Sequence, residues 1–101
     1  MVSFVLMTMR FSWDPTKAAS NFRKHGVGFE EALTVFGDPL ARIHDDPSHS
    51  EREGRELIVG HSARGRLLLV TFTERTGVIR LISARRATRL ERQDYEKATR
   101  F

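Results

Sequence analysis

The chain lacks several features that would assign it to a common functional class. It has no cysteine, which excludes a disulfide framework and any cysteine-ligated zinc site. It also has no Walker loop and no GxGxxG or GxSxG sequence, so nothing points to P-loop nucleotide hydrolases, dinucleotide-dependent dehydrogenases or hydrolases with a nucleophile elbow. The absence of cysteine fits a reducing cytoplasm, and we expect a cytoplasmic protein that uses no cofactor.

Long apolar runs are missing too. The apolar N-terminus, residues 1–8, lacks the basic segment of a signal peptide and is far shorter than the roughly 20 residues of a membrane helix. We assign residues 1–8 to an N-terminal extension, or to the edge of the first strand, with Met7 and Met9 as alternative starts. Residues 9–101 form a single expected domain with one modest core, since 40% of the chain is hydrophobic and 30% is charged.

Lysine is scarce, and the positive charge comes from arginine. The chain has 17 basic residues against 13 acidic ones, for a net charge of +4, and only Lys17, Lys24 and Lys97 are lysines. Arginine forms planar bidentate contacts with phosphate and stays ionised at any relevant pH. This balance favours a polyanion or an acidic protein as the partner.

The first half of the chain carries signals for a strand and two helices. Residues 10–13 alternate polar and apolar side chains, as in a short strand. Asp14 and Pro15 predict a capped helix start, and Gly26 predicts its left-handed stop. Apolar residues at helical spacing predict a second helix over residues 29–36, ended by Gly37-Asp38-Pro39.

The second half reads as a β meander followed by a helix. Residues 40–44 predict a further strand and residues 45–54 a polar loop. Segments 55–61, 67–73 and 78–84 are joined by short glycine-containing turns, which predicts antiparallel pairing. Thr88 and Glu91 form a capping-box pattern that opens a last helix. We therefore expect an α+β fold: a small antiparallel sheet with the N-terminal helices on one face, a C-terminal helix, and an opposite face that is partly open.

Arginines are threaded through the last predicted strand. Alternation along residues 78–86 predicts that Arg80 and Arg85 lie on opposite faces. Ser83 and Arg85 would join Thr71 and Thr73 of the neighbouring strand in a polar patch. Such a cluster fits a phosphate-binding site, because an unpaired buried guanidinium is costly. The alternative is that these arginines form ordinary surface ion pairs with Glu74, Glu91 and Asp94.

Several other residues have two interpretations. Lys24 and His25 could stabilise a phosphorane and transfer a proton, or they could only offset the dipole of the first helix. His61 fits a rim residue or part of the site, and Tyr95 fits a core anchor or a catalytic phenol. His44, Asp45, Asp46 and His49 match no specific metal-site spacing, so we expect a solvated loop and no metal site. RNA cleavage needs no metal, because the 2′-hydroxyl is a built-in nucleophile.

Two segments together resemble the BrnT family of toxins. The first is Lys24-His25-Gly26-Val27 followed by Phe29-Glu30-Glu31-Ala32, and the second is residues 79–88, which contain Arg80-Leu81-Ile82-Ser83-Ala84-Arg85. The resemblance extends over about residues 9–98, and its further positions are Trp13-Asp14, Lys17, Asn21, Phe36, Asp38-Pro39, Glu51, Glu53, Arg55, residues 58–62, Arg75, Glu91 and Tyr95. Gly28 stands where the family often has a serine helix cap.

The resemblance implies a function and partners. It implies a RelE-like fold, metal-independent RNA cleavage that arrests translation, and neutralisation by a BrnA-like antitoxin in a type II toxin–antitoxin pair. Operator DNA would be contacted only indirectly, through the antitoxin.

We predict that arginines contact the phosphate and that Lys24 and His25 supply charge and protons. The predicted catalytic set is Lys24, His25, Arg75, Arg80, Arg85, His61 and Tyr95. The predicted substrate-binding residues are Arg64, Arg86 and Ser83. The alternative function is a non-catalytic basic module that docks an acidic protein or nucleic acid.

Overall fold

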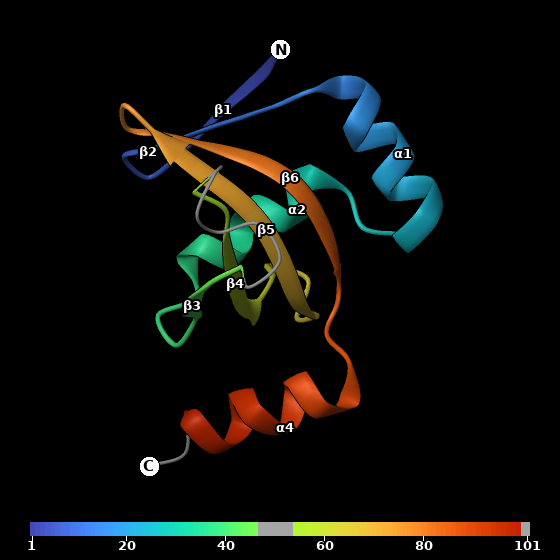
Figure 1. The fold of residues 1–101 in the computed structure, drawn as a ribbon, viewed down its shortest axis with the longest axis vertical. Helices are drawn as coiled ribbons and strands as arrows, with labels where there is room; N and C mark the ends of the chain where they lie inside the picture. Colours follow the sequence, from blue (N-terminus) through green and yellow to red (C-terminus); the bar gives the residue numbers. More distant parts are fainter. Residues whose placement is uncertain (47–53, 100–101) are drawn as a thin grey trace.

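The computed structural model describes residues 1–46 and 54–99 and has an α+β fold (Figure 1). The strands are β1 (Val2–Leu6), β2 (Met9–Trp13), β3 (Arg42–Asp45), β4 (Glu56–His61), β5 (Leu67–Arg75) and β6 (Val78–Arg86). The helices are α1 (Pro15–His25), α2 (Phe29–Ala32), the 3-10 helix η1 (Leu33–Gly37) and α4 (Arg89–Ala98). The predicted fold class is confirmed.

One six-stranded sheet organises the molecule, in the order β1-β2-β6-β5-β4-β3. Strands β4 to β6 form the predicted antiparallel meander, and β3 extends it by pairing antiparallel with β4. Strand β2 is the exception to antiparallel pairing, because it lies parallel to the first residues of β6. Strand β1 pairs with β2 as an antiparallel hairpin at the edge of the sheet. The assignment of residues 1–8 as an extension outside the domain 9–101 stays a prediction.

Local sequence signals fix the ends of the helices. The Asp14 side chain accepts a hydrogen bond of 2.8 Å from the Thr16 amide, and Gly26 ends α1 with a φ of 70°. Thr88 and Glu91 form the complete capping box of α4. Gly28 precedes α2 without a side-chain cap, as the missing serine predicted.

The main core lies between one face of the sheet and the segment α2–η1. Apolar side chains of β2, β4, β5 and β6 meet those of the two short helices. Its largest fully buried members are Phe11, Trp13, Phe29, Val27, Val35, Leu68, Val70 and Leu81. The central strands of this face are therefore covered by the chain itself.

The described residues cover the opposite face of the sheet only at one end, where α4 lies (Figure 1). There Tyr95 packs in a smaller cluster with Val59, Leu67 and Leu69. The remainder of this face carries polar and charged side chains, including Thr73 and Arg80. We call it the open face.

A β-bulge on β6 changes which arginines share a face. Thr71 pairs with Ser83, but the next residue of β5, Phe72, pairs with Leu81, so Ile82 is an extra residue. Because an extra residue reverses the alternation that follows it, Arg80 and Arg85 both lie on the open face. The prediction that they lie on opposite faces is wrong, since simple alternation cannot foresee a bulge. The predicted patch of Thr71, Thr73, Ser83 and Arg85 does lie on one face.

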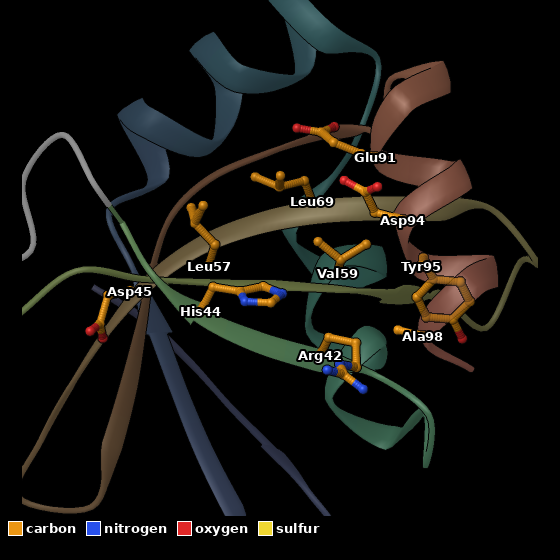
Figure 2. Close-up of a pocket in the computed structure, with 10 residues that line it drawn as sticks. All are labelled: Arg42, His44, Asp45, Leu57, Val59, Leu69, Glu91, Asp94, Tyr95 and Ala98. Carbon is orange, nitrogen blue, oxygen red and sulfur yellow. The ribbon is translucent and has the colours of Figure 1, made fainter. Parts of the chain in front are cut away.

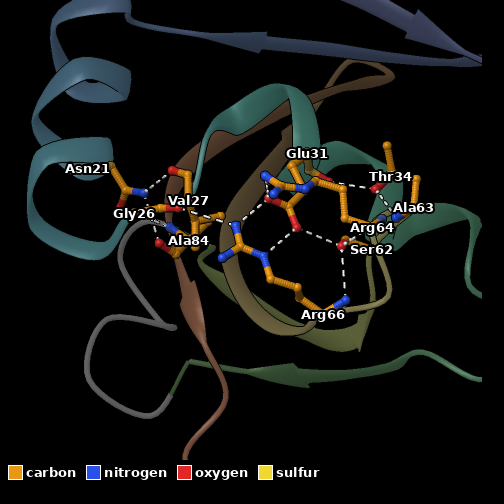
Figure 3. Close-up of polar contacts among 10 residues, drawn as sticks. All are labelled: Asn21, Gly26, Val27, Glu31, Thr34, Ser62, Ala63, Arg64, Arg66 and Ala84. Carbon is orange, nitrogen blue, oxygen red and sulfur yellow. Dashed lines mark hydrogen bonds and ion pairs between the residues drawn. The ribbon is translucent and has the colours of Figure 1, made fainter.

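Asn21 fastens α1 to the free edge of β6 (Figure 3). Its side chain donates 2.8 Å and 3.0 Å hydrogen bonds to the carbonyls of Ala84 and Val27, and accepts one of 3.0 Å from the Ala84 amide. The amide side chain thus satisfies both backbone groups of Ala84 as a neighbouring strand would. These three hydrogen bonds hold the C-terminal part of α1 beside the open face.

Candidate functional site

A cationic groove crosses the open face beside α1. It consists of two depressions of about 440 Å³ and 310 Å³ that share Lys17, Arg55 and Ile82 among their lining residues. Arg75 and Arg80 line the first, and Lys24 and His25 line the second. The structure thus brings four of the predicted catalytic residues to one surface. We define the cationic groove by Lys17, Lys24, His25, Arg75 and Arg80.

Among the residues that the structure describes, no acidic side chain lines this groove. Within the described ranges, 1–46 and 54–99, no ion pair engages Lys17, Lys24, Arg75 or Arg80. The predicted alternative, that Arg75 and Arg80 pair with neighbouring carboxylates, therefore does not describe these two residues. A concave surface that carries positive charge alone concentrates anions near it.

Hydroxyl groups add hydrogen-bonding capacity between the charges. Ser12 and Thr73 line the depression around Arg80, and Ser20 and Ser83 line the one around His25. Hydroxyls can donate to phosphate oxygens without adding charge. Of the predicted substrate-binding residues, Ser83 is the one that the structure places in the groove.

Lys17 is a groove residue that the sequence reasoning did not select. It lies two helical turns before Lys24 on α1, and residues seven apart share a helix face. That spacing was readable in the sequence. Arg55 and Ser12 could not have been found in this way, because β2 and the segment before β4 meet only in the folded sheet.

Arg85 is paired, in contrast with Arg80. Its guanidinium donates two hydrogen bonds of 2.8 Å to the two carboxylate oxygens of Glu91. This bidentate contact is the main reason why the pKa of Glu91 falls to about 2. The predicted ion pair exists here, and it joins the end of β6 to the first turn of α4. A catalytic role for Arg85 stays a prediction.

His61 and Tyr95 form a separate cluster with Asp38, at the end of β4. The Tyr95 hydroxyl donates a 2.9 Å hydrogen bond to Asp38 Oδ2 and lies 3.3 Å from His61 Nδ1. The backbone amide of His61 donates a 2.7 Å bond to the same Asp38 oxygen. His61, Tyr95 and Asp38 line neither depression of the cationic groove. The cluster is thus distinct from the groove.

Burial and hydrogen bonds set the protonation of this cluster. Burial favours a higher pKa for Asp38, but hydrogen bonds from the backbone amides of His61 and Leu40 and from Tyr95 outweigh it, so its pKa lies below the usual range. Burial, with the hydrogen bond to Asp38, raises the pKa of Tyr95 to about 12. The phenol therefore stays protonated and acts as a donor that ties α4 to the end of η1.

Arg64 belongs to a third cluster, centred on Glu31 (Figure 3). Arg66 binds both carboxylate oxygens of Glu31, with a distance of 2.9 Å from Nε to Oε2. Ser62 donates a 2.7 Å hydrogen bond to Glu31, and Arg64 approaches it at 3.5 Å. The hydrogen bond from Arg66 is the main cause of the lowered pKa of Glu31. The cluster joins α2 to the β4–β5 turn.

Arg86 is exposed at the end of β6. Neither Arg86 nor Arg64 lines the cationic groove. Their assignment as substrate-binding residues stays a prediction.

The candidate metal ligands do not gather in the part of the chain that is described. His44 and Asp45 lie on β3, Asp46 is buried just after it, and His49 falls outside the described residues. Within residues 1–46 and 54–99, no three histidine or acidic side chains form a group that could hold a metal ion. Over the same residues, no helix has the length and apolarity that crossing a membrane requires.

A second pocket, of about 480 Å³, lies on the open face between α4 and strands β3 to β5 (Figure 2). Its floor is apolar and includes Leu57, Val59 and Leu69. Figure 2 shows Asp94 and Glu91 of α4 on one side of this floor and Arg42 and His44 of β3 on the other. We call it the apolar pocket.

A family model described as "Ribonuclease toxin, BrnT, of type II toxin-antitoxin system" matches residues 13–91. The chain belongs to the BrnT ribonuclease toxin family. The match covers α1, β6 and every residue of the cationic groove. The resemblance read from the sequence is thereby confirmed. A comparison with curated proteins gave no match.

A solved structure shows the same fold. It is the crystal structure of the Brucella abortus ribonuclease toxin BrnT, with 21% sequence identity and a TM-score of 0.62. The similarity covers 78% of this chain and 96% of that one. At this identity the likeness carries the fold alone, so the roles of individual residues rest on the geometry described above.

Proposed function

We propose that this BrnT-family chain is an endoribonuclease that cleaves RNA at the cationic groove without a metal ion and thereby inhibits translation in the cytoplasm. The observation that carries the proposal is the groove itself, where Arg75, Arg80, Lys17 and Lys24 converge with no carboxylate among the described lining residues. A protein that only needed surface charge for solubility would intersperse both signs. The groove instead matches the charge of an RNA backbone.

The groove contains the chemical groups that RNA cleavage requires. Attack of the 2′-hydroxyl on the adjacent phosphate needs a base, an acid for the leaving oxygen and cations that stabilise the phosphorane. We assign the phosphate contacts to Arg75 and Arg80, whose planar guanidinium groups bind two oxygens at once. His25 is the candidate for proton transfer, because imidazole both accepts and donates protons near neutral pH, and Lys24 adds charge beside it.

The proposal includes an antitoxin partner. A type II toxin is paired with a protein that neutralises it, and we propose a BrnA-like antitoxin that covers the cationic groove through acidic or amphipathic segments. Such a complex would contact operator DNA through the antitoxin alone. Electrostatic steering predicts that association slows steeply as ionic strength rises. An association rate that does not change with salt would contradict this part of the proposal.

Cleavage by the purified chain tests the nuclease. The antitoxin-free protein is incubated with RNA in excess chelator, and with a matched oligomer that carries one ribonucleotide in a 2′-deoxy background. We expect cleavage only after the ribonucleotide, giving a 2′,3′-cyclic phosphate. Intact RNA, together with normal growth on expression, would overturn the proposal. Cleavage that stops with chelator would overturn metal independence alone.

One pair of variants separates the nuclease from a purely binding module. Arg80→Ala and His25→Ala should abolish toxicity while the antitoxin still co-purifies. The binding module predicts the reverse for Arg80→Ala, with loss of partner binding and no cleavage in the wild type either. Gln93→Ala serves as the control, because Gln93 is exposed on α4 and lines neither the groove nor the pocket.

A further inference from the structure

The apolar pocket lies one nucleotide away from the cationic groove on the same face of the sheet. Ser83 of the groove pairs with Thr71, and Thr71 pairs with Leu57 of the pocket. Two strand spacings separate Ser83 from Leu57, about 10 Å. This is comparable to the span of a nucleotide from its phosphate to the far edge of its base. A backbone held in the groove can therefore place a base in the pocket.

The floor and size of the pocket suit a planar aromatic group. Leu57, Val59 and Leu69 make a flat apolar floor from neighbouring strands, and the Tyr95 ring closes one end (Figure 2). The volume of about 480 Å³ falls within the roughly 300–1,000 Å³ range of small-ligand clefts. Leu57 is only partly buried by the protein, so an occupant would remove further apolar surface from water.

The α4 side of the pocket rim is acidic and offers hydrogen-bond acceptors. Glu91 and Asp94 line it there, while Arg42 and His44 of β3 lie across the floor (Figure 2). Because the carboxylates of α4 repel a phosphate, this side of the rim favours a base over the RNA backbone. Glu91 is held by Arg85. Asp94 is exposed, and within the described residues no hydrogen bond or ion pair engages it. Its oxygens are acceptors only, and guanine presents two neighbouring N–H donors on one edge.

We propose that the apolar pocket binds a nucleobase of the RNA, with guanine preferred because its N–H edge binds the Asp94 carboxylate. The pocket would then set the sequence preference of cleavage. This inference rests on the proposed function, since it needs RNA in the groove. Continuity with the groove favours a base over an apolar side chain of a protein partner.

Binding of uncleavable RNA tests the pocket. The probes are short uridine oligomers with a 2′-O-methyl group on every nucleotide, and they carry guanosine, inosine or an abasic site at one position. Their Kd is measured by fluorescence anisotropy. For the wild type we expect the guanosine oligomer to bind about tenfold tighter than the abasic one, as for one base on an aromatic or apolar surface. Inosine, which lacks the exocyclic amino group, should fall between them.

Two variants and one control locate the effect. Asp94→Asn should equalise guanosine and inosine, because the carboxylate can no longer accept both N–H bonds. Ala98→Trp fills the pocket from α4 and should equalise all three oligomers. Gln93→Trp adds the same side chain to the exposed side of α4 and should keep the wild-type order. Circular dichroism of each variant checks folding, and Asp94→Asn, which changes no volume, keeps the test valid should Ala98→Trp not fold.

The outcomes distinguish the pocket from the nuclease. Equal binding of the guanosine and abasic oligomers by the wild type, with cleavage intact, overturns the pocket and leaves the proposed function standing. No binding of any oligomer and no cleavage overturns both. If Ala98→Trp keeps the base preference but loses affinity for the antitoxin, the pocket receives a protein segment and the nucleobase assignment is overturned.

Discussion

The arginines of the cationic groove and the arginine that binds Glu31 carry the same charge in opposite surroundings. Arg75 and Arg80 are exposed in the same groove as Lys17 and Lys24, with no carboxylate among the described lining residues. Arg66 is 22% exposed and binds a Glu31 carboxylate that is only 7% exposed. The first group leaves its hydrogen-bond donors available to a ligand, whereas the second uses them within the fold.

On the proposed function, this difference separates charge that serves RNA binding from charge that serves the fold. Four cationic side chains gathered with no acid among the described lining residues repel one another and cost stability, and a bound RNA backbone would offset that repulsion. Arg66 instead compensates a buried carboxylate and connects α2 to the β4–β5 turn. Changes in the groove should therefore alter activity alone, and changes at Arg66 should alter stability alone.

The largest expected effect is at Arg80. Arg80→Ala should lower the rate of RNA cleavage by about 10²- to 10³-fold, the usual loss when one donor to a developing charge is removed. The thermal midpoint should stay the same or rise, because repulsion within the groove decreases. Single-turnover cleavage and a melting curve measure the two quantities. Arg92→Ala is the matched control: Arg92 is exposed on α4 and outside the groove. Equal loss in both variants would mean that net charge, and not the site, drives cleavage.

Arg66→Ala should show the reverse pattern. Removing it leaves the buried Glu31 carboxylate with only Ser62 and the exposed Arg64 at 3.5 Å, which should destabilise the fold by about 2–3 kcal/mol. The midpoint of urea unfolding reports the loss, and cleavage per folded molecule should be unchanged. The double variant Glu31→Gln with Arg66→Met removes both charges and should recover most of the stability. A double variant as unstable as Arg66→Ala would show that the charge pair is not the cause.

The sequence predicted the fold well because local signals and pattern agree. Asp14, Gly26 and the capping box of Thr88 and Glu91 each placed a helix end where the structure has it. Two features of the fold could not be predicted from the sequence. The parallel pairing of β2 with β6 joins residues 10–12 to 78–80, far apart in the chain. The bulge at Ile82 depends on how β5 and β6 fit together, and it put Arg80 and Arg85 on the same face.

Arg85 is intermediate between the groove arginines and Arg66, and unfolding at low pH should measure how much its ion pair with Glu91 stabilises the fold. The folded pKa of Glu91, about 2, lies below its ordinary value of 4.5, so the stabilisation is present above about pH 5 and is lost as the pH falls towards 2. Both side chains are partly exposed, so Arg85→Met should cost only about 1–2 kcal/mol at pH 7. Urea unfolding at pH 7 and pH 3 should show this difference shrinking in acid.

Arg86→Met is the control for that experiment, because Arg86 is exposed on the neighbouring position of β6. Its effect should be small at both pH values. A pH-independent cost of Arg85→Met would show that Arg85 acts by packing of its aliphatic part and not through Glu91.

The sequence could name the candidate site residues but could not sort them into sites. Lys24, His25, Arg75 and Arg80 meet in the groove, whereas His61 and Tyr95 meet Asp38 in a cluster that does not line it. Both groups consist of residue types that can bind phosphate or transfer protons, so residue type does not separate them. The two groups differ in which strand ends and helix turns lie next to each other, and the order of strands in the sheet determines this.

Tyr95→Phe tests this separation with a smaller effect. The change removes the hydrogen bond to Asp38 and should lower stability by about 1 kcal/mol, while the ring keeps its packing on Val59 and Leu69. Since the pKa of Tyr95 is raised to about 12, the phenol is a poor acid, and cleavage should stay within about twofold of the wild type, as measured in single turnover. A hundredfold loss with unchanged stability would instead place Tyr95 in the catalytic set.

The smallest effect is expected at the N-terminus of α2, on the structural side of the comparison. Gly28 precedes this helix with φ of −82° and no side-chain cap, and an added Cβ would meet only Glu30 Oε1 at 3.6 Å and Phe22 Cδ2 at 3.9 Å. Gly28→Ser should therefore add a cap without a clash and raise stability by a few tenths of a kcal/mol, about 1–3 °C in the melting temperature.

Gly60→Ala is the opposite case, because its Cβ would lie 2.9 Å from the Ala41 Cβ, and it should destabilise the fold. Neither change touches the groove, so any change in cleavage by Gly28→Ser would show that α2 and the groove are coupled.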